Sequence, residues 1–128
     1  HNTITCPDIE CNNKSHSFDP YSCMSLNIPS DNKSTLEDCF IESGKPEILD
    51  DDNKWFCEGC KTKKNAVRYT SIWTVPNILI VHLKKFTRTG KKIDKKIVFD
   101  INNIDMGKYM SKNNNKKGSL IYELYAIS

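Results

Sequence analysis

Two close cysteine pairs, far apart in the sequence, constrain this chain more than any other feature. Cys6 and Cys11 have four residues between them, and Cys57 and Cys60 have two between them. A structural zinc ion takes four ligands at tetrahedral corners, and two short knuckles supply two thiolates each. Such a closed site leaves no coordination position for substrate or water, so the metal would stabilise the fold rather than catalyse. We therefore expect one structural Zn²⁺ bound by these four cysteines.

A disulfide framework is the alternative, because the total of six cysteines is even. The sequence shows no apolar leader and is rich in lysine, which indicates an intracellular protein and favours zinc. Cys23 and Cys39 lie outside the two pairs, in a predicted strand and a predicted helix. Neither has the sequence context of a nucleophile, so we expect both to be buried free thiols. His16, the nearest other metal-binding side chain, is expected to be exposed on a strand.

A short apolar run from Ile78 to Leu83 predicts the central strand of the fold. Its residues are mostly β-branched or aliphatic, with His82 as the interruption, and the run is too short to span a membrane. Pro76 cannot donate a hydrogen bond to a sheet, so it marks the end of the preceding segment. We expect this strand to be buried on both faces.

One helix is predicted at residues 34–43. Ser34 and Glu37 have the spacing of a capping box, in which each side chain bonds the backbone N–H of the other residue. Leu36, Cys39 and Phe40 then follow at helical spacing on one face. A glycine and a proline just beyond residue 43 provide a stop signal.

Alternating polar and apolar residues predict the remaining strands, at residues 3–6, 14–18, 21–28, 54–57, 66–72, 96–99 and 120–127. Gly90 predicts a hairpin turn, and residues 104–109 predict a turn with an apolar anchor. The polar, low-complexity residues 111–118 predict a mobile loop. Together these patterns predict an α+β fold that is mainly antiparallel β.

Length and composition exclude several classes of protein. A chain of 128 residues suits one domain or part of a larger one, and 38% apolar residues support one small core. No stretch approaches the roughly 20 apolar residues of a membrane helix, so no membrane partner is expected. The net charge of +3 defines no partner, and we interpret the lysine runs as solvated loops.

The order of several motifs resembles that of the ubiquitin-specific protease family. Each motif alone is weak, but the ordered set is highly specific and covers nearly the whole chain. In sequence order, the segments that resemble the family are 15–21 (Ser-His-Ser-Phe-Asp-Pro-Tyr), 24–29, 35–40 (Thr-Leu-Glu-Asp-Cys-Phe), 55–61 (Trp-Phe-Cys-Glu-Gly-Cys-Lys), 73–86, 98–99 and 122–127.

The resemblance implies the fingers and palm of a papain-like cysteine protease that grips ubiquitin. Residues 1–28 and 47–73 would form the fingers, with zinc at the tips, and residues 74–128 would supply palm strands. The hairpin after Phe86 would overlie the groove for the C-terminal tail of ubiquitin, so Phe86, Arg88 and Lys91 are candidate ubiquitin contacts. His82 would be a structural histidine rather than the catalytic one.

Three departures from the family pattern affect this interpretation. The first knuckle has four intervening residues where the family usually has two, and Asp100 stands where the family usually has proline. The family's cysteine box and histidine box, which carry the nucleophile and its base, are both absent from this sequence. We therefore expect no catalytic residue here and an inactive chain by itself, whereas the parent protein would be a deubiquitinase.

A non-catalytic zinc ribbon that binds ubiquitin, another protein or nucleic acid is the alternative function. Nucleic-acid binding would weaken steeply with salt because phosphate counterions are released, and a ubiquitin contact would not. Aromatic residues among the lysines would favour nucleic acid, but residues 84–96 contain only Phe86. Nucleic acid is therefore the less expected partner.

Overall fold

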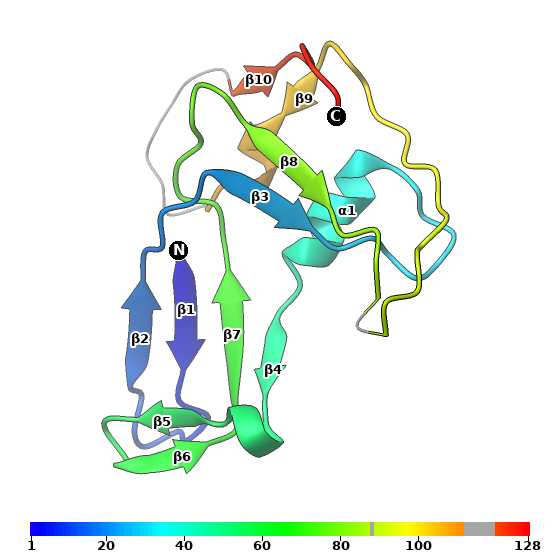
Figure 1. The fold of residues 1–128 in the computed structure, drawn as a ribbon. Helices are drawn as coiled ribbons and strands as arrows, with labels where there is room; N and C mark the ends of the chain where they lie inside the picture. Colours follow the sequence, from blue (N-terminus) through cyan, green and yellow to red (C-terminus); the bar gives the residue numbers. More distant parts are fainter. Residues whose placement is uncertain (88, 112–119) are drawn as a thin grey trace. The chain divides into compact units, whose positions relative to one another are not determined.

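The described residues of this computed structural model, 1–87, 89–111 and 120–128, divide into two units (Figure 1). Unit 1 comprises residues 1–20 and 44–71, and unit 2 comprises residues 21–43 and 72–128. Each unit thus joins two separate stretches of sequence. The assignment of these stretches to fingers and palm stays a prediction. No helix among the described residues has the length and apolar character that a bilayer span requires.

Unit 1 is built on a four-stranded antiparallel sheet with the strand order β2-β1-β7-β4. These strands are β1 (Asn2–Thr5), β2 (Lys14–Ser17), β4 (Glu47–Leu49) and β7 (Ala66–Thr70). A hairpin of β5 (Trp55–Cys57) and β6 (Thr62–Lys64) follows the short 3-10 helix η1 (Asp51–Asn53). The strands predicted near residues 3–6, 14–18, 54–57 and 66–72 are confirmed, whereas β4 and β6 were not predicted.

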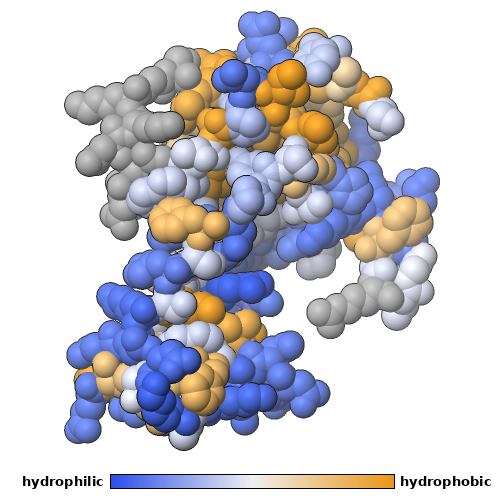
Figure 2. All heavy atoms as spheres, turned by 60° about the vertical axis from the view of Figure 1, so that its left-hand side comes forward, coloured by the Kyte–Doolittle hydropathy of each residue, from blue (hydrophilic) through white to orange (hydrophobic). Residues whose placement is uncertain are grey.

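Very few residues of unit 1 are buried. They are Cys6, Leu49, Cys57 and Ala66, so two of the four are cysteines. Strand β2 is exposed along its whole length. In Figure 2, most of the surface of unit 1 is hydrophilic, and hydrophobic side chains gather mainly over unit 2. The hydrophobic effect, which scales with the apolar area removed from water, therefore contributes little to unit 1.

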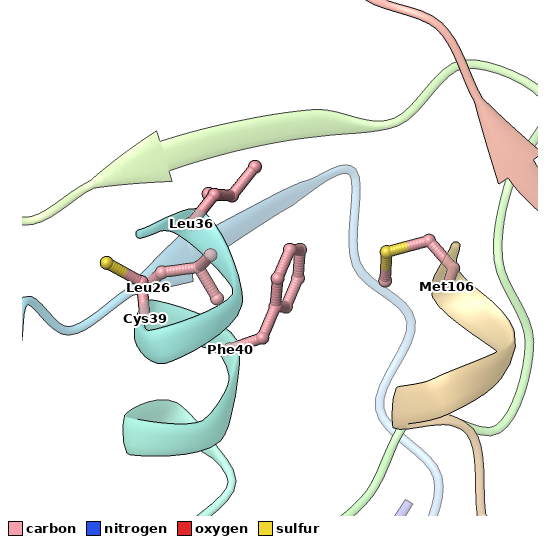
Figure 3. Close-up of a cluster of buried hydrophobic side chains, with 5 residues drawn as sticks. All are labelled: Leu26, Leu36, Cys39, Phe40 and Met106. Atoms are coloured by element: carbon pink, nitrogen blue, oxygen red, sulfur yellow. The ribbon is translucent and has the colours of Figure 1, made fainter. Parts of the chain in front are cut away.

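Unit 2 has an apolar core formed by Leu26, Leu36, Cys39, Phe40 and Met106 (Figure 3). Strand β3 (Cys23–Leu26) pairs in parallel with β8 (Ile80–Leu83), and α1 (Leu36–Ser43) packs against this pair. Strand β9 (Ile104–Asp105) pairs with β10 (Ile121–Tyr122) and leads into the 3-10 helix η2 (Met106–Tyr109). Met106 is fully buried, which confirms the predicted apolar anchor. Burial of such a side chain contributes about 1.5–3 kcal/mol.

The capping box of α1 lies one residue later than predicted. The N–H of Asp38 donates to Thr35 Oγ1 (3.1 Å), and the N–H of Thr35 donates to Asp38 Oδ2 (3.0 Å). The carbonyl of Ser34 accepts from the N–H of Val98 (2.7 Å), and the N–H of Leu36 donates to the carbonyl of Val98 (2.9 Å). These two bonds hold Thr35 in a parallel bridge with Val98, so the helix begins after Thr35. The predicted strand at 96–99 is reduced to this bridge between Thr35 and Val98.

The prediction that the central strand is buried on both faces is wrong. In β8, Val81 and Leu83 pack against the core, whereas Ile80 and His82 are exposed, and Ile80 is 54% accessible. Side chains of a strand alternate between its faces, and the core covers one face of this strand pair. Cys23, predicted to be buried, is exposed on the neighbouring strand β3, whereas Cys39 is buried as expected.

The last predicted strand is shorter than expected, because β10 covers Ile121–Tyr122 rather than residues 120–127. The predicted turn at Gly90 is confirmed, and this residue has a positive φ of 79°. Around it, the N–H of Thr87 donates to the carbonyl of Lys91 (2.9 Å). The predicted mobile loop lies almost wholly outside the described residues.

One lysine holds the segment that leads from β3 to α1. The ammonium of Lys95 donates to the backbone carbonyls of Pro29 (2.7 Å), Asp31 and Lys33 (3.1 Å). The ammonium of Lys85 donates in turn to the carbonyl of Lys95. The chain after the Gly90 turn is therefore fixed to residues 29–33 through main-chain acceptors.

We predict that Thr35→Ala lowers the free energy of unfolding by about 1 kcal/mol, because it removes the N-cap acceptor of α1. The Thr35 hydroxyl and N–H hold the pKa of Asp38 below its usual value. A lowered carboxyl pKa stabilises the fold above the ordinary pKa of about 4, and this stabilisation is lost as the pH falls.

Urea denaturation followed by tryptophan fluorescence measures this change, with exposed Thr74→Ala as the matched control. The difference between Thr35→Ala and the parent chain should shrink in acid. An equal loss in both variants at pH 7 would contradict the capping role.

Candidate metal centre

The two cysteine pairs lie in the connections of two hairpins of unit 1. Cys6 and Cys11 lie between β1 and β2, and Cys57 and Cys60 lie at the turn between β5 and β6 (Figure 1). The N–H of Cys6 donates to the carbonyl of Asn13 (2.9 Å), which extends the β1–β2 pairing to the first cysteine. The hairpins thus place one cysteine of each pair at the end of a strand.

Both connections turn sharply just after their second cysteine. Asn12 follows Cys11 with φ 48°, and Lys61 follows Cys60 with φ 55°. This left-handed conformation is uncommon outside glycine, although asparagine adopts it more readily than most residues. In the first connection, the N–H groups of Cys11 and Asn12 both donate to the carbonyl of Asp8. The repeated turn gives the two connections a similar backbone path past their second cysteine.

The four sulfur atoms converge on one point, with all pairs within 4.8 Å. The Sγ atoms of Cys6 and Cys60 lie 3.7 Å apart, and those of Cys11 and Cys57 lie 3.6 Å apart. A tetrahedral zinc site with Zn–S bonds of about 2.3 Å separates its sulfurs by about 3.8 Å. All six cysteines are free thiols in the structure, so it contains no disulfide framework. The donor set and its spacing therefore fit Zn²⁺.

Hydrogen bonds within the cluster favour a negative charge on one sulfur. Burial would raise the pKa of the Cys57 thiol, but the N–H of Cys60, the amide of Asn13 and nearby thiols lower it to about 6. Hydrogen bonding to Cys11, together with burial, raises the pKa of Cys60. Burial raises the pKa of Cys6. Because metals bind thiolates, loading this cluster requires release of protons from its remaining thiols.

Gly59 allows the two cysteine pairs to approach each other. A Cβ atom at this position would lie 2.6 Å from Cys11 Sγ and 3.2 Å from Asn13 Cβ. The first distance is shorter than the contacts that Cβ atoms make in proteins, so a side chain at this position would displace Cys11 Sγ from the cluster. Sequence reasoning missed Gly59, although a glycine between the cysteines of a short knuckle is a signal that could have indicated it.

Charged residues flank the cluster on one side. The carboxylate of Asp8 lies 3.9 Å from Cys60 Sγ, and the ammonium of Lys64 lies 3.6 Å from the same carboxylate. Such an ion pair contributes little to stability because both side chains are partly exposed to water. His16, as predicted, is exposed, and its ring stacks on His1 with centroids 5.4 Å apart.

The predicted ubiquitin contacts belong to unit 2 and to its Gly90 turn. Phe86 is 63% accessible and forms an antiparallel bridge with Lys92, and Lys91 is exposed. Arg88 lies outside the described residues. The structure therefore brings the four cysteines together and leaves Phe86 and Lys91 exposed at the other predicted site.

Sequence comparisons identify related proteins over most of the chain. The family model described as ubiquitin carboxyl-terminal hydrolase matches residues 2–128. Ubiquitin carboxyl-terminal hydrolase 12 of Saccharomyces cerevisiae is 38% identical over 96 residues, which cover 73% of this chain and 8% of the relative. Ubiquitin carboxyl-terminal hydrolase Usp2 of Drosophila melanogaster is 33% identical over 129 residues, which cover 98% of this chain and 13% of the relative.

Solved structures are also similar to this chain over most of its length. A chain of the SAGA Ubp8/Sgf11/Sus1/Sgf73 DUB module bound to ubiquitin aldehyde is similar to this chain with a TM-score of 0.70. The two are 29% identical, and the similarity covers 95% of this chain and 28% of the other. The described chain thus corresponds to a small part of its relatives, and the predicted α+β fold is confirmed.

Proposed function

Because the chain belongs to the ubiquitin carboxyl-terminal hydrolase family, we propose that it is the ubiquitin-gripping part of a cysteine-type deubiquitinase. The match of the family model over residues 2–128 carries this proposal. The ubiquitin aldehyde in the related DUB module supports ubiquitin, rather than nucleic acid, as the partner of this chain. The parent protein would cleave the bond after the C-terminal glycine of ubiquitin through an acyl-enzyme. The six cysteines of this chain form no disulfide in the structure, which supports a reducing, intracellular location for the parent protein.

We propose that Cys6, Cys11, Cys57 and Cys60 bind one structural Zn²⁺ ion. The convergence of four sulfurs within 4.8 Å supports this assignment. With all four positions taken by thiolates, the ion would supply a cross-link between the β1–β2 and β5–β6 connections and no catalytic function. Cys23 and Cys39 stay outside this ligand set because the cluster of sulfur atoms comprises the other four cysteines.

A second part of the proposal concerns the contact with ubiquitin through the Gly90 turn. Phe86 presents an exposed aromatic ring, and aromatic residues are enriched among the residues that dominate binding energy. The N–H of Lys91 donates to Thr87 Oγ1 (3.1 Å), which fixes the backbone of the lysine within the turn. Phe86 would supply apolar contact, and Lys91 and Arg88 would supply positive charge.

Catalysis would come from segments of the parent outside this chain. A thiol protease needs a cysteine with an adjacent base and donors for the oxyanion. Burial raises the pKa of Cys39 and so disfavours its nucleophilic thiolate form. The ring of His82 contacts Ser25 Oγ (3.3 Å) rather than a thiol. Within the described part of the chain, no cysteine has a histidine as a hydrogen-bond partner.

We predict that the purified chain retains one zinc ion and that Cys57→Ser loses it, because serine replaces a fully buried thiolate ligand. Elemental analysis measures the metal content. The matched control is Cys23→Ser, which changes an exposed cysteine of unit 2 and should keep the zinc. Chelation should expose four further thiols to alkylation. Equal metal content in both variants would refute the ligand set.

We predict that Phe86→Ala weakens ubiquitin binding at least fivefold, because an anchor that costs more than 1 kcal/mol is lost. Titration of isotope-labelled ubiquitin by NMR measures the affinity. Ile41→Ala, at an exposed position of α1, is the control and should bind as the parent chain does. Unchanged binding by Phe86→Ala would exclude this residue from the contact.

We predict that the chain by itself does not hydrolyse a fluorogenic amide at the C-terminus of ubiquitin, because no cysteine of the described residues has a histidine beside it to act as a base. Release of the fluorophore should equal the background rate at high protein concentration. Turnover above background that a thiol reagent abolishes would show that the chain carries its own nucleophile, contrary to this expectation.

A further inference from the structure

We propose that Asn13 is a positioning residue of the metal centre, which donates its side-chain amide to Cys57 and stabilises the thiolate that the metal binds. The inference rests on the proposed zinc site and extends it to a residue outside the ligand set. Asn13 comes from the β1–β2 connection, whereas Cys57 comes from β5. The contact therefore joins the two hairpins independently of the metal.

The geometry of Asn13 suits this role. Its Nδ2 atom lies 3.5 Å from Cys57 Sγ, within the range of a hydrogen bond to sulfur. Its carbonyl accepts from the N–H of Cys6 (2.9 Å), so the backbone of Asn13 is fixed relative to the first ligand. The absence of a side chain at Gly59 leaves room for it, because a Cβ there would lie 3.2 Å from Asn13 Cβ.

The negative charge of four thiolates explains why the buried sulfur of Cys57 requires hydrogen-bond donors. Four thiolates around one Zn²⁺ carry a net charge of −2, and such a charge is costly to bury unless N–H groups compensate it. Cys57 is completely buried, and it accepts from the N–H of Cys60 (3.5 Å) as well as from Asn13. Asp8 adds a further negative charge beside Cys60. The Asn13 amide is thus a side-chain donor that offsets the charge on buried Cys57.

Substitutions of Asn13 test the proposal through zinc affinity, measured by competition with a chromophoric chelator. Asn13→Ala should weaken Zn²⁺ binding about tenfold, the usual scale for residues that hydrogen-bond to metal ligands. Asn13→Asp keeps the shape of the side chain but places a carboxylate beside the sulfur, so it should bind more weakly than Asn13→Ala. Asn13→Gln keeps an amide donor and should lie between Asn13→Ala and the parent chain.

A spectroscopic measurement separates hydrogen bonding from packing. In the Co²⁺-loaded chain, a hydrogen bond lowers the energy of the sulfur lone pairs and raises the energy of the sulfur-to-cobalt charge-transfer band. Loss of the amide in Asn13→Ala should therefore shift this band to longer wavelength. The control is Asn65→Asp, which adds the same charge at an exposed position between β6 and β7 and should change neither the band nor the affinity.

The outcomes distinguish the inference from the proposed function. The role of Asn13 is supported if the unsubstituted chain binds zinc most tightly, Asn13→Ala more weakly and Asn13→Asp most weakly, and if the band shifts in Asn13→Ala. If the unsubstituted chain binds one zinc ion, and the Asn13 variants bind it with the same affinity and an unshifted band, the inference is wrong but the proposed function is not. The inference is also wrong if Asn13→Asp binds zinc as tightly as the unsubstituted chain, because the shape of the side chain alone would then be enough for tight binding. If the unsubstituted chain binds no metal, both the inference and the proposed zinc site are wrong.

Discussion

The convergence of four thiols at the tips of two hairpins is the interaction on which unit 1 depends. Its buried residues are so few that apolar burial cannot offset the conformational entropy of ordering its strands. Small structural units of this kind usually require a metal or disulfides. In the proposed zinc site, Cys6 and Cys57 would therefore serve both as ligands and as half of the buried residues of unit 1. This explains why residues with no metal contact of their own, such as Gly59, are constrained by the position of a sulfur atom.

Unit 2 is stabilised in the opposite way. Its core consists of apolar side chains from β3, α1 and η2, and the ring of Phe40 stacks on Tyr109 with centroids 4.6 Å apart. Met106 reaches the core from a segment about 80 positions after Leu26, so the cluster joins both stretches of the unit. The exposed turn around Gly90 extends from β8, one strand of this scaffold. A rigid support for an exposed loop is the usual arrangement of a binding surface.

The four clustered cysteines and most strands could be predicted from the sequence because both leave local signals. Cysteine spacing is independent of tertiary structure, and so is the alternation that marks β1, β2 and β7. The position of the helix cap was missed by one residue because Ser34 bonds Val98, a partner distant in sequence. The exposure of Ile80 could not be predicted because it depends on which face of β8 the core covers. The contact of Asn13 with Cys57 was missed because it depends on the approach of a second hairpin, which the sequence does not show.

The way Lys95 holds residues 29–33 has an evolutionary consequence. An ammonium group that recognises three main-chain carbonyls is indifferent to the side chains that those residues carry. Substitutions at the exposed residues Ser30, Asn32 and Lys33 should therefore accumulate among homologues, provided the backbone path is kept. The backbone path of this segment depends instead on Lys95, which is distant in sequence. We therefore expect homologues to vary at these exposed positions and to keep the lysine.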